Sequence, residues 1–152
     1  MVVSAGRYGR LLVARPAPRT RSGFSARVVM GHVLRFVSVG LLVAIGVIHL
    51  HLWFTGYRYL PTNGPLFLAD AVAAFVLALA LLAWPRVLVA ILGIGFAVAT
   101  LGALIVSINF GLFGFTEFSG GPFVSTSIVI ESMVSVCLAA WIVVVPIRLG
   151  ST

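Results

Sequence analysis

Four long apolar segments are the feature that most constrains the fold of this chain. They cover about residues 33–54, 66–84, 87–110 and 123–145. Each is close to or above the roughly 20 helical residues that span the hydrocarbon core of a bilayer. The sequence therefore predicts an all-α protein, a four-helix transmembrane bundle in residues 31–148, with a short tail at 149–152.

Composition supports a membrane protein over a soluble one. Hydrophobic residues make up 61% of the 152 residues and charged residues only 9%, against about 25% charged in ordinary soluble domains. A soluble chain of this length could not hide so much apolar area from water. The formal charge of +7 is concentrated in a flank beside the first span, without a nucleic-acid motif. We therefore expect the lipid bilayer, and not a nucleic acid, as its partner.

Residues 1–30 form an arginine-rich segment that lacks acidic residues and sustained periodicity. It holds six of the ten arginines, together with Pro16 and Pro18. Such a segment predicts a disordered cytoplasmic tail. Two alternatives stay open: an organellar presequence, which has a similar composition, and a translation start at Met30.

Arginine placement predicts the orientation. The connection at Pro85 and Arg86 is so short that spans two and three should be antiparallel neighbours. In an up-down bundle with the N-terminus inside, nine arginines lie on the inner side and only Arg58 on the outer side. The positive-inside rule then predicts cytoplasmic N- and C-termini and a multi-pass location in the cell (inner or plasma) membrane.

Polar side chains within the spans predict a pocket. Ionisable residues inside a membrane usually face the bundle interior, and Asp70 and Glu131 lie within spans two and four. In span one, His51 follows small residues such as Gly40 and Ala44, which favour close helix packing. This pattern predicts His51, and not His49 about 160° away, as the inward histidine.

Each span thus places one strongly polar residue in its outer half, whereas the inner halves are almost purely apolar. This distribution predicts a pocket that opens outward, beneath an aromatic and polar rim. The candidate ligand-binding residues are His51, Asp70, Asn109 and Glu131, with Trp53, Tyr57 and Arg58 at the rim.

Four interpretations of these residues stay open. Asp70 can be a cap or pair with Arg58 or His51, and Glu131 can be neutral and hydrogen-bonded, because burial favours a neutral carboxyl group. His51, Asp70 and Glu131 have the ligand chemistry for a metal ion. The aromatic rim suits a small amphipathic ligand such as a quinone or a lipid head group. Small-residue seams suit an accessory subunit of a larger membrane complex or a homo-oligomer.

Soluble-type hydrolase chemistry is not indicated. The sequence lacks GxSxG, HExxH and phosphate-cradling motifs, and its single cysteine, Cys137, rules out an internal disulfide or a CxxC motif. No cofactor is strongly implied.

Three motifs carry a resemblance to known proteins: HLHLW at residues 49–53, GYRYLPTNGPLFL at 56–68 and GFTEF at 114–118. Over about residues 37–145 the chain resembles small four-helix membrane proteins of high-GC actinobacteria, a group that implies an architecture but no activity. In architecture it is also similar to DoxX-like membrane proteins, which include subunits of quinone-linked redox systems.

From these observations we expect a non-enzymatic accessory or small-ligand-binding membrane protein. The alternative is a redox-linked membrane subunit, associated with a quinone or a metal, of DoxX-like type.

Overall fold

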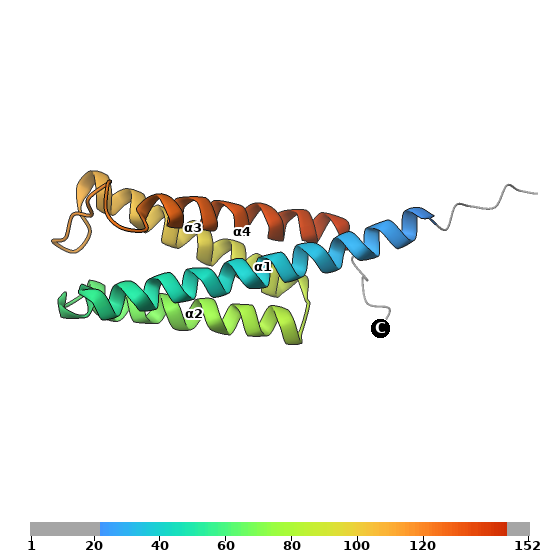
Figure 1. Ribbon diagram of the computed structural model, residues 1–152, viewed down its shortest axis with the longest axis horizontal. Coiled ribbons are helices and arrows are strands. Elements are labelled where there is room, and N and C mark those ends of the chain that lie inside the picture. Colours follow the sequence, from blue (N-terminus) through green and yellow to red (C-terminus); the bar gives the residue numbers. More distant parts are fainter. Residues whose placement is uncertain (1–21, 146–152) are drawn as a thin grey trace, which may run out of the picture.

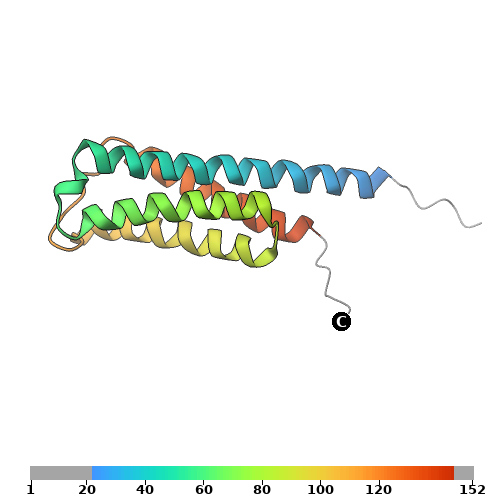
Figure 2. The same cartoon turned by 90° about the horizontal axis from the view of Figure 1, so that it is seen from below.

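A computed structural model describes residues 22–145 of the chain. They form four long helices: α1 (Ser22–Thr55), α2 (Asn63–Ala83), α3 (Val87–Phe110) and α4 (Val124–Val144), with a short 3-10 helix, η1 (Tyr57–Tyr59), between α1 and α2. The long helices lie side by side along one axis, as both views show (Figure 1, Figure 2). The predicted all-α, four-helix architecture is confirmed for the described residues.

Three of the four predicted spans match the observed helices within three residues at each end, but α1 is longer than predicted. It begins at Ser22, so residues 22–30 are helical. The prediction that these residues belong to a disordered tail is wrong. The segment after Pro18 contains no proline, and helix-favouring residues such as Ala26 and Arg27 continue the helix backwards. The predictions for residues 1–21 and 146–152 lie outside the described residues.

The outer surfaces of the helices are strongly apolar. The side chains of Leu79, Val136 and Val143, for example, are 66%, 68% and 84% exposed. All four helices are long and apolar enough to cross a membrane. Because soluble monomers rarely expose such extensive apolar area, these surfaces are compatible with contact to lipid.

Large side chains of one helix pack against small side chains of its neighbour in the core. Leu42 and Ile45 of α1 belong to one buried cluster with Ala74 and Ala78 of α2. On α3, Gly93 approaches α4 so closely that an added Cβ would lie 2.8 Å from Leu138 Cδ1. The small residues at these contacts let the helix backbones come together.

Several small residues do not pack against a neighbouring helix, among them Gly40, which was predicted to favour close packing of span one. Gly40, Gly95 and Gly102 have no heavy atom within 4 Å of an added Cβ, so they do not face a neighbouring helix. The close approaches instead use Gly46 of α1, alanines of α2 and Gly93 of α3.

Arg35 joins α1 to the end of α2. Its Nε donates to the backbone oxygen of Leu81 over 3.0 Å, and its Nη2 donates to that of Leu82. These carbonyls belong to the last turn of α2, where helix oxygens lack intrahelical partners and the helix dipole favours a cation. The arginine therefore caps α2 from a neighbouring helix, at the end of the bundle opposite η1.

Candidate functional site

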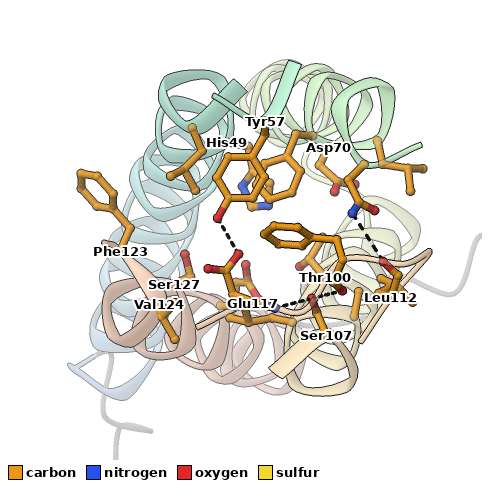
Figure 3. A pocket seen from close by; sticks show the side chains of 18 of the residues that line it. His49, Tyr57, Asp70, Thr100, Ser107, Leu112, Glu117, Phe123, Val124 and Ser127 are labelled. Carbon is orange, nitrogen blue, oxygen red and sulfur yellow. Dashed lines mark hydrogen bonds between the residues drawn. The ribbon is translucent and has the colours of Figure 1, made fainter. Parts of the chain in front are cut away.

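A cavity of about 100 Å³ lies at the end of the bundle where α1 ends and where α2 and α4 begin. All four helices, η1 and the α3–α4 connection contribute to its wall (Figure 3). The three acidic residues of the whole sequence, Asp70, Glu117 and Glu131, all line this cavity. No arginine is among the lining residues in the described part of the chain.

Asp70 and Glu131 lie at matching depths. Each is seven residues beyond the first residue of its helix, Asn63 in α2 and Val124 in α4. At 1.5 Å per residue, both carboxyl groups lie about 10 Å along their helices from this end. Asp70 is half-buried, whereas Glu131 is only 2% exposed. Two carboxyl groups thus reach the same level of one cavity from two helices.

Glu131 has an unsatisfied oxygen. Its Oε2 is buried and has no hydrogen-bond partner among the residues that the structure describes. The neighbouring hydroxyl group of Thr100, which also lines the cavity, is 3.1 Å from two backbone oxygens of its own helix, those of Phe96 and Ala97. A buried carboxylate oxygen without a donor is costly, so the Glu131 carboxyl group, which belongs to the cavity wall, is where a bound donor would gain most.

Tyr57 and Glu117 close part of the cavity wall. The Tyr57 hydroxyl donates to Glu117 Oε2 over 2.5 Å, which joins η1 to the α3–α4 connection (Figure 3). Burial raises the pKa of the Tyr57 phenol, and the hydrogen bond and negative charge of Glu117 raise it further. The Tyr57 ring also packs against Phe67 and Phe115, with ring centroids 4.3 and 5.6 Å away.

The α3–α4 connection is anchored and locally strained. The Glu117 backbone N–H donates to the Ser107 backbone oxygen over 3.2 Å and to its Oγ over 3.3 Å. Asn63 of α2 donates to the Leu112 oxygen over 3.4 Å. Phe113 and Phe123 have φ angles of 52° and 68°, a left-handed conformation that bulky residues rarely adopt and that is concentrated at functional sites.

His49, and not His51, is the cavity histidine. His49 is 8% exposed and lines the cavity, whereas His51 is exposed and packs edge-on against Phe123 at 5.4 Å. The prediction that His51 points inward is therefore wrong. The buried face of α1 holds Leu42, Ile45 and His49 together with the small residues Ser38 and Gly46.

His49 Nδ1 lies 2.9 Å from the backbone oxygen of Ile45. A carbonyl oxygen only accepts, so Nδ1 holds the proton and Nε2 is left for other partners.

Among the other predicted residues, Asp70, Glu131 and Tyr57 line the cavity, and Asn109, Trp53 and Arg58 do not. Asn109 is exposed and its side chain donates to the Ile105 oxygen of its own helix. Arg58 is exposed and donates to the Tyr59 hydroxyl over 2.6 Å. On α3 the polar residues that line the cavity are Thr100 and Ser107. With Gly93 and Ala97 they form one buried stripe. The spacing of these residues, three, four and seven positions apart, could have indicated the stripe from the sequence.

The candidate metal ligands do not converge. His51 lies outside the cavity that Asp70 and Glu131 share, and residues 22–145 contain no group of three or more histidine, cysteine or acidic side chains placed to hold a metal ion. The metal site that was one open interpretation of His51, Asp70 and Glu131 is therefore not assembled in residues 22–145.

Comparison with known proteins gives no family for this chain: no family model, no curated protein and no solved structure matches it significantly.

Proposed function

We propose that this protein is a multi-pass cell-membrane protein that binds a small ligand in the cavity between its helices, and that it has no catalytic role of its own. In this proposal the bundle is up-down and antiparallel, both termini are cytoplasmic, and the cavity opens toward the outside. The buried, unpartnered Glu131 Oε2 is the observation that carries the binding role. A core without function would be more stable with an apolar residue there.

The size of the cavity limits the ligand. Sites for drug-sized ligands occupy about 300–1,000 Å³, and an engineered cavity that takes up benzene measures about 150 Å³. The observed volume of about 100 Å³ suits a few waters or a molecule smaller than benzene. It is too small for a quinone ring, so the redox-linked, DoxX-like alternative gains no support from this site. An accessory role in a larger complex or a homo-oligomer remains compatible with a binding role.

Cysteine accessibility tests this proposal. Ser127 lines the cavity, and Ser38 is fully buried in the core nearer the opposite end. With Cys137 replaced by Ala, and with the protein in lipid nanodiscs, Ser127→Cys should react with a small water-soluble methanethiosulfonate. Ser38→Cys is the matched control and should stay unreactive. If Ser127→Cys is as inert as Ser38→Cys, solutes do not reach the cavity and the proposal fails.

A further inference from the structure

We infer that the molecule bound in this cavity is a small primary ammonium ion, with the Glu131 carboxylate as its counter-ion. This inference rests on the proposed function, because it specifies the chemical class of ligand for the same cavity. It follows from three properties of the cavity: its charge, its unsatisfied acceptor and the composition of its wall.

The charge of the wall favours a cation. All three acidic side chains of the sequence line the cavity and no lining residue is an arginine, although the sequence contains ten. The ionisable side chains of the wall are these three acidic residues, His49 and Tyr57, and no permanent positive charge lies among them. An anion would be repelled at such a site, and a cation would be attracted.

The unsatisfied oxygen requires a hydrogen-bond donor. Glu131 Oε2 is buried without a partner from the described residues, and an ammonium group offers three N–H donors together with a positive charge. A water molecule would supply the hydrogen bond without the charge, and a quaternary ammonium ion would supply the charge without the donor. A primary ammonium ion supplies both, as a charge-assisted hydrogen bond.

The rest of the wall suits an organic ion better than an inorganic one. Tyr57, Phe67 and Phe115 line the cavity, and the Tyr57 ring packs against both phenylalanines. Aromatic faces attract cations. Leu52 and Leu104 add apolar surface for an alkyl chain. The described residues offer no cluster of three ligands for a metal ion. By comparison with benzene in about 150 Å³, the observed volume fits about four or five non-hydrogen atoms.

Calorimetric titration of the full chain in phosphatidylcholine nanodiscs tests the inference, with n-propylammonium as the probe. Its neutral isostere 1-propanol and the anion propionate are the comparison compounds, and empty nanodiscs give the background. With four non-hydrogen atoms, n-propylammonium should bind with a dissociation constant no smaller than about 40 μM. We expect 1-propanol to bind at least tenfold more weakly, and propionate not to bind.

Two variants assign the effect to Glu131. Glu131→Gln keeps the shape and removes the charge, so it should weaken n-propylammonium binding at least tenfold and leave 1-propanol binding unchanged. Asn109→Leu removes an exposed polar group outside the cavity and should leave the affinities for n-propylammonium and for 1-propanol unchanged.

The possible failures are distinguishable. Equal affinity for n-propylammonium and 1-propanol, or an unchanged n-propylammonium affinity in Glu131→Gln, would overturn the inference and leave the binding role in place. The absence of n-propylammonium binding would overturn it too. The reactivity of Ser127→Cys then decides separately whether the cavity admits solutes at all.

Discussion

At the scale of single residues, Glu131 is the side chain whose position is hardest to explain by stability. Its buried Oε2 lacks a partner, and replacing a buried charged group by an apolar one of similar volume is often stabilising. We predict that Glu131→Leu raises the free energy of unfolding by about 1–3 kcal/mol in the absence of added ligand. Reversible thermal or denaturant unfolding in detergent measures the change.

Glu131→Gln is the matched control for that substitution. It removes the charge but keeps buried polar atoms, so its stability should lie between those of the wild type and Glu131→Leu. If Glu131→Leu is instead less stable than the wild type, the carboxyl group stabilises the fold and its retention needs no ligand.

Tyr57 provides a test of the cavity wall that depends on pH. Because burial and Glu117 raise its pKa, the folded protein keeps this phenol protonated above about pH 10, where an ordinary tyrosine ionises. Its contribution to stability is therefore fully present below that pH and is lost as the pH rises through the raised value. The wild type and Tyr57→Phe should show the same rise in phenolate absorbance between about pH 9 and 11.

The unfolded proteins are the control for this titration. In denaturant the rise in phenolate absorbance should be larger for the wild type than for Tyr57→Phe, by the absorbance of one phenolate. A smaller rise for folded Tyr57→Phe than for the folded wild type would show that Tyr57 titrates normally and is not held by Glu117.

At the scale of helices, α3 contains a matched pair of glycines. An added Cβ at Gly93 would lie 2.8 Å from Cδ1 of Leu138, which is fully buried, whereas one at Gly95 meets nothing within 4 Å. We predict that Gly93→Ala destabilises the protein by about 1–3 kcal/mol through overpacking. Gly95→Ala should be neutral or stabilising by up to about 1 kcal/mol, because alanine favours the helix. Unfolding of both variants in the same detergent measures the difference.

The two substitutions have the same chemistry, so detergent effects cancel between them. Equal stabilities would mean that α3 does not approach α4 closely at Gly93. A destabilised Gly95→Ala would mean that Gly95 is covered by another chain or by a part of the protein outside residues 22–145.

The same helix shows what the sequence could and could not predict. Its bounds, Val87–Phe110, match the predicted span because a polar turn at Pro85 and Arg86 precedes it and Gly111 follows it. Its inward face could not be predicted from apolar periodicity, because lipid-facing and core-facing residues are both apolar. Asn109, the predicted pocket residue of this helix, is exposed. The spacing of small residues therefore did not show which face of α3 packs against a neighbouring helix.

Polar residues on α2 and α4 gave better predictions than those on α1. Asp70 and Glu131 are the only acidic or basic residues of their helices, so the cost of exposing them to lipid fixes which face turns inward. On α1 two histidines lie two residues apart and compete for the same position. Which of the two histidines faces inward depends on how α1 packs. His49 is the inward one because it lies on the buried face of α1 with the large residues Leu42 and Ile45.

At the scale of the whole molecule, the two ends of the bundle differ in charge. Arg27, Arg35 and Arg86 lie toward the end where α1 begins and α2 ends, and the carboxyl groups and the cavity lie toward the other end. At about 1.5 Å per residue, the 34 residues of α1 measure about 51 Å. This length exceeds the hydrocarbon core of about 30 Å, so in the proposed membrane orientation we expect the start of α1 to extend beyond the hydrocarbon core on the arginine-rich side.

The positive-inside rule then predicts which end faces the cytoplasm, and two exposed positions report it. Ser119 lies in the α3–α4 connection, and Ala83 is the last residue of α2 at the opposite end. In intact cells producing the Cys137→Ala protein, a membrane-impermeant thiol reagent should label Ser119→Cys. Ala83→Cys should be labelled only after the membrane is permeabilised, and the parent protein without cysteine gives the background. If Ala83→Cys alone is labelled in intact cells, the orientation of the bundle is the reverse of the predicted one. The acidic cavity would then open toward the cytoplasm and draw its cations from there.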